Sequence, residues 1–270
     1  MAPIMKIAFL RHGPTEWNAA GRIQGHTDIG LSAEGAAKMG ANRLPGGIAA
    51  TRVFVSPLSR ARQTAHLLGL SEETVDVRLM EQHWGDWEGM TRTEILARHG
   101  EDAFVRAGRA GAFQPPGGES TDALNARLAH FLRDVAAGEG DAVAVAHLGV
   151  LRAAYTLATG WDMATAMPEA LDVSRILLLS LTKDGTPSIV GLNLAFESAG
   201  DAISPPTCHR PARPGDPQSR SSSPGLSGRS IILGTMSLIP SLETVWIARI
   251  NRAMRKGAAG LRSVTDRIPW

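Results

Sequence analysis

The stretch MKIAFLRHGPTEWN, residues 5–18, decides how the rest of this sequence is interpreted. Residues 5–10 form a short apolar run that is typical of a buried strand. Arg11, His12 and Gly13 follow where this strand would end. In α/β proteins the residues that leave the carboxyl end of a strand line the usual ligand site, and a glycine there lets the backbone approach a ligand closely. The stretch therefore predicts a strand that carries Arg11 and His12 into a site.

The tripeptide Arg-His-Gly occurs a second time, in ILARHGED at residues 95–102. Here it ends a helical pattern instead of a strand. Gly100 stands where a helix-capping glycine belongs. Arg98 and His99 lie in the last turn, where positive charge complements the helix dipole. We interpret this second copy as structural.

Apolar runs alternate with helical patterns through the first 195 residues. Strands are predicted over 5–10, 52–56, 142–146, 175–181 and 188–194, and helices over 31–43, 58–68, 90–99, 119–137 and 149–159. The segment KDGTP, residues 183–187, is typical of the turn in a hairpin. This alternation predicts an α/β fold of three layers, with a mostly parallel central sheet and helices on both faces.

The composition is that of an ordinary globular protein, with 43% hydrophobic and 20% charged residues among 270. Its single cysteine, Cys208, excludes an intrachain disulfide framework and suits a reducing compartment. The first residues do not have the pattern of a signal peptide. No uninterrupted apolar run reaches the length of a membrane-spanning helix. We therefore expect a cytoplasmic protein.

Charge divides the chain into two parts, and composition divides the second part again. Residues 1–200 hold 18 Lys and Arg against 22 Asp and Glu, whereas residues 201–270 hold 10 against 4. We expect one domain over 1–200, a disordered Pro-, Ser- and Arg-rich linker over 201–229, and a basic tail over 230–270. Because the positive charge belongs to the tail, it is no evidence for nucleic-acid binding by the domain.

The tail has one helical pattern, SLETVWIARINRAMRKG, at residues 241–257. Its apolar residues recur four apart and basic residues crowd its end, which would suit weak contact with an anionic membrane surface. The alternative is an extension with one marginal helix and no partner.

Chemistry-bearing residues follow two further strands. SPLSRARQTA at residues 56–65 carries Arg60, and AHLGVLR at residues 146–152 carries His147. EQHWGDWEG at residues 81–89 adds a carboxylate. Two histidines, two arginines and one carboxylate would form a phosphate site without a metal, and no spacing in the sequence is that of a metal-ligand set.

These segments resemble the histidine phosphatase superfamily, the phosphoglycerate mutase-like family. The match is most specific in RHGPTEWNAAGRIQGHTDIGLSAEG, residues 11–35, and returns in SPLSRARQTA and in PPGGES at residues 115–120. The resemblance covers nearly all of residues 5–195 and implies the phosphoglycerate mutase-like fold. One departure is visible, because the family often has His-Gly-Gly where this chain has His147-Leu148-Gly149.

The resemblance implies a role for each of five residues. His12 would attack phosphorus as a neutral imidazole and form a phosphohistidine. Arg11 and Arg60 would bind the phosphoryl oxygens, and His147 would be a third donor if protonated. Glu81 would protonate the leaving group and then activate water. No metal and no cofactor is implied.

Further residues match the family by position alone. Asn18, Gln24, Gly25 and Leu148 would line the substrate pocket. Trp17, Trp84 and Trp87 are left out of the site, since an aromatic residue more often packs than recognises a ligand. The remaining histidines of residues 1–200 are interpreted as structural or exposed: His26, His66, His83, His99 and His130.

Phosphatases and mutases of this family share the same machinery. Family mutases carry a longer basic insertion after the acid residue, whereas residues 84–100 here are short and lack lysine. The segments GDWEGMTRTEI and PPGGES resemble the phosphatase branch. We therefore favour a phosphomonoester hydrolase that acts on a small phosphorylated metabolite, such as α-ribazole phosphate, a sugar phosphate or a phosphoglycerate-like acid.

Two alternatives stay open at this point. One is phosphoryl transfer of the phosphoglycerate mutase type. The other, of a different class, is a non-catalytic phosphate-binding module tethered by its basic tail. The oligomeric state does not follow from the sequence.

Overall fold

The computed structural model describes residues 5–49, 51–108, 112–163, 167–168 and 170–200. Its centre is a six-stranded sheet with the order β4-β3-β5-β1-β6-β7. The strands are β1 (Met5–Arg11), β3 (Arg52–Val55), β4 (Glu73–Val75), β5 (Ala142–Ala146), β6 (Ile176–Leu181) and β7 (Pro187–Leu194). β4, β3, β5 and β1 pair in parallel, and β6 and β7 add an antiparallel hairpin. The prediction of a mostly parallel sheet is confirmed.

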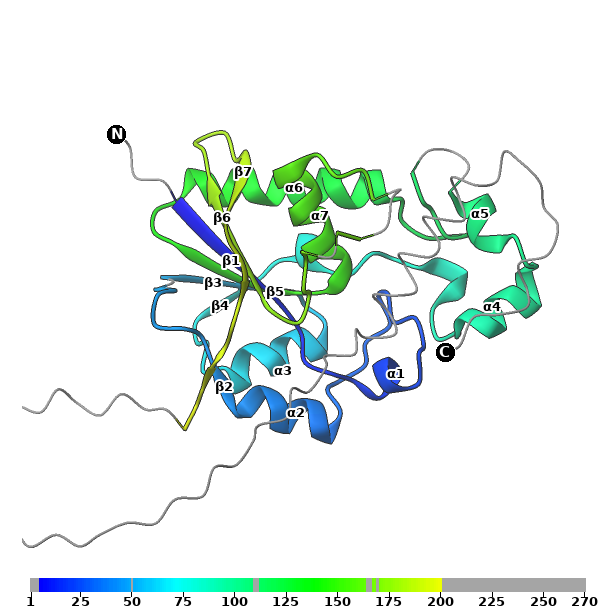
Figure 1. Ribbon diagram of the computed structural model, residues 1–270, viewed down its shortest axis with the longest axis horizontal. Helices are drawn as coiled ribbons and strands as arrows, with labels where there is room; N and C mark the ends of the chain where they lie inside the picture. The colour runs from blue at the N-terminus through cyan, green and yellow to red at the C-terminus, as the bar shows by residue number, and fades with distance from the viewer. Residues whose placement is uncertain (1–4, 50, 109–111, 164–166, 169, 201–270) are drawn as a thin grey trace, which may run out of the picture.

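Helices cover both faces of the sheet (Figure 1). One face carries α6 (Thr121–Ala137) and α7 (Leu148–Thr159), and the other carries α2 (Ala33–Gly40) and α3 (Ser59–Leu67). The alternation of side chains along β1 explains this arrangement. Ile7 and Phe9 point into the cluster with α6 and α7, whereas Ala8 and Leu10 point into the cluster with α2 and α3. All four are fully buried, so the strand supports two hydrophobic cores at once.

A third, smaller cluster forms beyond the carboxyl ends of the parallel strands. It joins the 3-10 turn η2 (Gly85–Trp87) to α4 (Arg92–His99) and α5 (Ala103–Ala107). Trp87, Ile95 and Phe104 form its buried centre. This segment lies to the right of the sheet in Figure 1 and forms one wall over the strand ends.

Several short elements were not predicted. They are α1 (Glu16–Ala19), α5, the 3-10 turns η1 (Val77–Leu79) and η2, the edge strand β4, and the two-stranded pair of β2 (Asn42–Arg43) with β8 (Glu197–Ser198). The helix expected over 31–43 is shorter, because Ser32 caps α2 and the chain extends into β2 after Ala41. The helix expected over 90–99 begins at Arg92 because Thr91 and Glu94 form a capping box.

The second Arg-His-Gly copy lies where the sequence indicated. Gly100 ends α4 with a φ of 90°, and its N–H donates to the carbonyl of Leu96. The structural interpretation of Arg98 and His99 as helix-end residues is therefore confirmed. The predicted linker over 201–229 and the tail over 230–270 lie outside the described residues, so both stay predictions.

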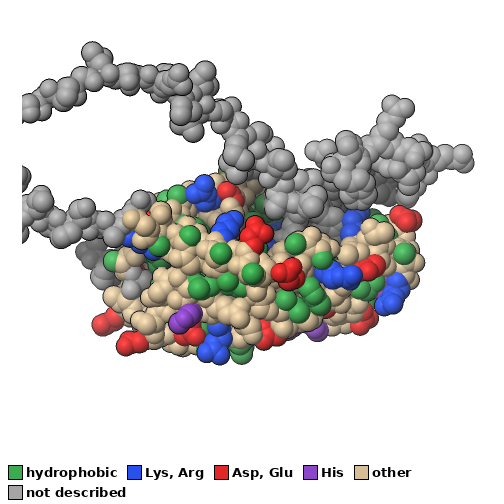
Figure 2. All heavy atoms as spheres, turned by 90° about the horizontal axis from the view of Figure 1, so that it is seen from below, with side chains coloured by type: hydrophobic (Ala, Val, Ile, Leu, Met, Phe, Trp, Pro, Cys, Tyr) green, Lys and Arg blue, Asp and Glu red, His purple; other side chains and the backbone are tan. Residues whose placement is uncertain are grey.

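Two surface properties bear on partners. Within the described residues, no helix has both the length and the apolar character needed to cross a membrane. Lys and Arg side chains are interspersed with Asp and Glu over the described part of the face shown in Figure 2. That face has no extended patch of one sign among its described residues.

Candidate active site

His12 lies at the end of β1, in the middle of the sheet. Its backbone N–H donates to the carbonyl of Ala146 at 3.0 Å, which continues the pairing with β5. The ring atom Nδ1 lies 2.7 Å from the carbonyl oxygen of Gly13. Since a carbonyl only accepts, Nδ1 carries the proton and Nε2 keeps a lone pair. Burial, and then the charges of Arg11 and Arg60, hold the pKa of His12 well below its usual 6.5. His12 is therefore a neutral imidazole at neutral pH.

Arg60 is fully buried in the first turn of α3. Nη1 donates to the carbonyl of Thr27 at 2.9 Å and Nη2 to the carbonyl of Gly25 at 2.8 Å. Nε donates to Nδ1 of His147 at 3.3 Å. Burial lowers the pKa of Arg60 and the charge of Glu81 opposes this, yet a guanidinium stays charged in proteins. These contacts occupy three of the five N–H donors of a guanidinium, so two remain for an anion.

His147 follows β5 directly and caps α7 without exposing its ring to solvent. Its ring centroid lies 5.1 Å from that of His12. Nδ1 accepts from Arg60, and Nε2 lies 2.7 Å from the hydroxyl oxygen of Ser56. Burial, and then the presence of His12 and the charge of Arg60 nearby, hold the pKa of His147 well below 6.5. The ring is thus neutral, and both of its nitrogens have partners in the protein. The predicted role of His147 as a donor to phosphate therefore requires a bound phosphoryl dianion, which would raise this pKa.

Glu81 reaches the amino end of α7 from the turn after η1. Its Oε1 accepts from the backbone N–H of Gln82 at 2.8 Å and of Gly149 at 2.9 Å. Oε2 has a longer contact of 3.2 Å to the same N–H of Gly149. A Cβ at position 149 would collide with Glu81 Oε1. The close contact with Glu81 requires glycine at position 149, and this chain has it although it lacks the glycine that the family often has at position 148. Leu148 is the first residue of α7.

The loop after β1 is held by packing and by one hydroxyl. Arg11 is half-buried at the end of β1. The N–H of Gly13 donates to Thr64 Oγ1 of α3 at 3.0 Å. A Cβ on Gly13 would overlap the side chain of Met39. Gly13 is thus required by close contact inside the protein, a reason that the sequence analysis did not give.

The residues placed in the pocket by family position have local roles in the structure. Asn18 Oδ1 accepts from the backbone N–H and the hydroxyl of Thr15, each at 3.1 Å, and so closes the capping box of α1. Gln24 is buried, and its Oε1 lies 3.1 Å from the same hydroxyl oxygen. Gly25 has a φ of 53°, which suits glycine. Their contact with substrate stays a prediction.

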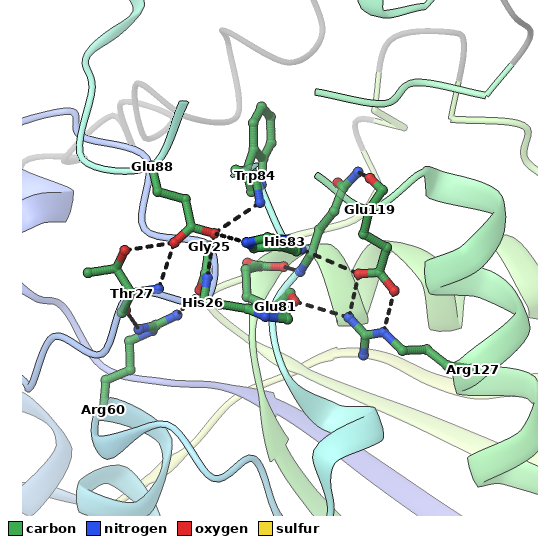
Figure 3. A network of polar contacts seen from close by, with 11 residues as sticks. Gly25, His26, Thr27, Arg60, Glu81, His83, Trp84, Glu88, Glu119 and Arg127 are labelled. Carbon is green, nitrogen blue, oxygen red and sulfur yellow. Dashed lines mark hydrogen bonds and ion pairs between the residues drawn. The ribbon is translucent and has the colours of Figure 1, made fainter. Parts of the chain in front are cut away.

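Four residues that the sequence analysis left out of the site complete its walls (Figure 3). Arg127 of α6 donates through Nη2 to the carbonyls of Met80 at 2.8 Å and Glu81 at 3.0 Å. It also forms an ion pair with Glu119 at 2.7 Å. Glu88 binds the loop around Gly25, and His26 Nε2 lies 2.8 Å from the carbonyl oxygen of Glu81.

A weak signal for two of these residues was present in the sequence. Glu88 belongs to EQHWGDWEG and Glu119 to PPGGES, both singled out without a role. Arg127 lies in no segment that the sequence pattern singled out, so nothing in the sequence indicated its place in the site. Among the described residues, no group of three or more His, Cys, Asp or Glu could hold a metal ion. The arrangement can bind a tetrahedral anion, supply a neutral nitrogen nucleophile and exchange a proton through Glu81.

The comparisons with known proteins agree with this chemistry. Residues 7–195 match the model of the histidine phosphatase superfamily, branch 1. The chain is 35% identical to phosphoglycerate mutase-like protein 4 of Arabidopsis thaliana over 187 residues, which are 65% of this chain and 77% of that protein. It is 33% identical to a glucosyl-3-phosphoglycerate phosphatase of Mycobacterium tuberculosis over 164 residues, which are 55% of this chain and 72% of that protein.

Other matches are shorter or structural. The alignment with the 2,3-bisphosphoglycerate-dependent phosphoglycerate mutase of Maricaulis maris spans 51% of that protein, about half its length. Among solved structures, a mycobacterial glucosyl-3-phosphoglycerate phosphatase complexed with VO3 superposes with a TM-score of 0.57 at 27% identity. That match covers 71% of this chain and 100% of the other.

Proposed function

The chain belongs to the histidine phosphatase superfamily, and from that premise we propose that it is a phosphomonoester hydrolase that works through a phosphohistidine on His12. One observation carries the proposal. His12 is buried, neutral and bonded through Nδ1 to the carbonyl of Gly13, so Nε2 keeps its lone pair. The charges of Arg11 and Arg60 act on this ring. A neutral nucleophile beside two cations suits attack on a dianionic phosphoryl group.

The first half of the reaction breaks the ester bond. Arg11 and the two remaining N–H donors of Arg60 bind the phosphoryl oxygens. His12 Nε2 donates its electron pair to phosphorus as the P–O ester bond breaks. The leaving alkoxide takes a proton from Glu81, which becomes a carboxylate. His147, beside His12, gains a proton more readily once the dianion is bound and then serves as a further donor.

The second half restores the enzyme. Glu81 removes a proton from water while the water oxygen attacks phosphorus. The P–N bond to His12 breaks and its electron pair returns to Nε2. Inorganic phosphate leaves, and Glu81 is protonated again for the next cycle. No metal or cofactor takes part in these steps.

The substrate is a small phosphorylated metabolite. All of the relatives named above contain phosphoglycerate in their names, so 3-phosphoglycerate and glucosyl-3-phosphoglycerate are the first compounds to test. The mutase alternative, supported by relatives with that name, requires the released monophosphate to accept the phosphoryl group in place of water. A cytoplasmic location belongs to the same proposal and is supported by the single cysteine.

Phosphate release from p-nitrophenyl phosphate tests the proposal. The full chain should release phosphate, its His12→Ala variant should lose at least about 10³-fold in kcat/KM, and His99→Ala should match wild type. Addition of EDTA should leave the rate unchanged. A protein that binds phosphate but releases none from any ester would instead be a binding module.

The same assay separates hydrolase from mutase. With 3-phosphoglycerate, a hydrolase releases inorganic phosphate whether or not 2,3-bisphosphoglycerate is present. A mutase needs the bisphosphate as primer and forms 2-phosphoglycerate instead.

A further inference from the structure

Glu88 lies in the wall over the strand ends, and its carboxylate accepts from three backbone N–H groups and one hydroxyl. Oε1 accepts from the N–H of His26 at 2.8 Å and of Trp84 at 3.0 Å. Oε2 accepts from the N–H of Thr27 at 2.8 Å and from its hydroxyl at 2.7 Å. The side chain is only 12% exposed. The donors of His26 and Thr27 belong to one loop, whereas Trp84 lies on the same segment as Glu88 (Figure 3).

This loop is also the partner of Arg60. The carbonyl of Gly25 and the N–H of His26 belong to one peptide group, and in a trans peptide these two groups point in opposite directions. The N–H end donates to Glu88 and the carbonyl end accepts from Arg60 Nη2. One rigid unit therefore connects the carboxylate of Glu88 to the guanidinium of Arg60.

A second connection runs through Thr27, whose N–H and carbonyl belong to two successive peptide groups. Thr27 donates its N–H and hydroxyl to Glu88, while its carbonyl accepts from Arg60 Nη1. The loop also packs closely against this carboxylate, since Gly25 has a φ of 53° and a Cβ there would collide with Glu88. Both carbonyls that orient Arg60 thus lie in a loop held by Glu88.

Charge adds to this geometry. Burial alone would raise the pKa of Glu88, but the hydrogen bonds from Thr27, His26 and Trp84 outweigh burial and lower it. Glu88 is therefore an anion at neutral pH. A chain of hydrogen bonds from an anion through peptide groups to a cation strengthens each member.

We propose that Glu88 is a positioning residue for phosphate capture, which holds the loop 25–27 so that the two remaining N–H donors of Arg60 face the phosphoryl group. The inference rests on the proposed phosphoryl chemistry and assigns Glu88 to substrate binding, not to the proton transfer of Glu81. Its loss should weaken binding of phosphoryl groups more than it slows turnover.

Arg127 offers a matched control on the opposite wall of the site (Figure 3). It is also partly buried, donates to the backbone carbonyls of Met80 and Glu81, and forms a separate ion pair with Glu119. Removing the charge of Glu88 or of Arg127 weakens hydrogen bonds to partly buried backbone groups in both cases. Because Arg127 holds the segment of Glu81 and not that of Arg60, its loss should affect turnover and leave anion affinity close to wild type.

Calorimetric titration with orthovanadate, together with kinetics on p-nitrophenyl phosphate, tests the proposal on the full chain. For Glu88→Gln we expect the vanadate Kd and the KM to rise about tenfold, which is the effect of weakening one charge-assisted hydrogen bond. The kcat should stay within about threefold of wild type. For Arg127→Met the vanadate Kd should stay within about twofold.

A double-mutant cycle separates positioning from general loosening. If Glu88 acts through Arg60, then Glu88→Gln should change vanadate affinity less than about twofold once Arg60→Met is already present. Three results would each overturn the proposal. The first is a tenfold loss of vanadate affinity on Glu88→Gln both in wild type and in Arg60→Met. The others are unchanged vanadate affinity in a folded Glu88→Gln variant, or a loss of affinity in Arg127→Met as large as that in Glu88→Gln.

Two further measures keep the test decisive. If Glu88→Gln does not fold, Thr27→Val removes one donor to Glu88 at nearly constant shape and should weaken vanadate binding about threefold; unchanged affinity there counts against the proposal. Vanadate binding needs no turnover. A wild-type protein that binds vanadate and hydrolyses no ester therefore contradicts the proposed hydrolase while the role of Glu88 is still measured.

Discussion

At the scale of single residues, hydrogen bonds give the two facing histidines different chemistry. His12 bonds to protein through Nδ1 and keeps a lone pair on Nε2. His147 has protein partners at both nitrogens, Arg60 and Ser56. Burial lowers both pKa values, so neutrality alone does not distinguish the rings. This difference in partners supports the proposal that His12 is the nucleophile, while His147 contacts Arg60.

Glu81 is the residue whose role can be tested through the leaving group. A proton donor matters most when the departing alkoxide is strongly basic, and general acid catalysis contributes about 10²–10⁴-fold. We expect Glu81→Gln to lose roughly 10²-fold more kcat/KM with an alkyl phosphate than with p-nitrophenyl phosphate. Steady-state kinetics with the two esters measure this. Equal losses would remove Glu81 from the acid role.

At the scale of elements, the amino end of α7 fixes the position of that acid. The backbone N–H of Gly149 in the first turn of α7 donates to Glu81. The backbone N–H groups of Gln82 and Gly149 therefore orient the side chain of Glu81 at the start of α7. The strand β5 ends directly before this helix and delivers His147. One strand-to-helix junction therefore supports both the acid and the ring that faces the nucleophile.

Substitution of Gly149 should therefore affect catalysis, while substitution of a second glycine of α7 should not. Gly149→Ala places a Cβ against Glu81 Oε1, and we expect kcat to fall about 10–100-fold, more for alkyl esters. Gly160→Ala is the control, since Gly160 ends α7 at a φ of 74° with nothing within 4 Å of its Cβ position. It should cost about 1–2 kcal/mol of unfolding free energy and leave kcat unchanged. Similar kcat values for both variants would argue against this role of Gly149.

The sequence predicted long elements better than short ones for a physical reason. β1, β5 and α6 carry five or more residues in one periodic pattern, which fixes their type. β2 and β8 have two residues each, too few for any period, and form through pairing between positions far apart in the chain. The same holds for the site. His12 and His147 follow predicted strands directly and Arg60 lies in the first turn of the helix after another, whereas Arg127 meets Glu81 only through the packing of α6.

At the scale of the whole molecule, burial of neutral histidines makes stability depend on pH. In the unfolded chain a histidine titrates near 6.5, whereas burial lowers the pKa of His12 and His147 well below that value in the fold. Below pH 6.5 the unfolded state therefore binds protons that the folded state does not. The stability contribution is complete above pH 6.5 and is lost as the pH falls.

Urea unfolding at pH 7.5, 6.5 and 5.5 tests this dependence. Between pH 6.5 and 5.5 the free energy of unfolding should fall by about 1 kcal/mol for each of the two histidines. In His12→Gln the fall should be about half as large, because one of the two groups no longer titrates. A free energy that stays constant from pH 7.5 to 5.5 would contradict the buried neutral state of both rings.

The whole molecule also sets where the catalytic domain ends. All proposed catalytic residues lie between Arg11 and His147, but β8 follows the last strand of the main sheet and pairs with β2. The ion pair of Glu197 with Arg43 and the bond from the N–H of Ala199 to the carbonyl of Ala41 close this contact. We therefore expect the folded domain to need residues 196–200 in addition to the main sheet.

Truncation at these two positions is the corresponding prediction. A chain of residues 1–200 should keep the turnover and unfolding free energy of the full chain, because it retains β8. A chain of residues 1–195 should lose about 1–2 kcal/mol of unfolding free energy through the missing hydrogen bonds.

Vesicle sedimentation of the full chain and of 1–200, with and without anionic lipid, measures how much residues 201–270 contribute to membrane binding. Lipid-dependent binding of the full chain alone would assign the tail to a membrane surface. A folded but inactive 1–200 chain would show instead that the tail completes the site, and it would contradict the placement of all catalytic groups before β6.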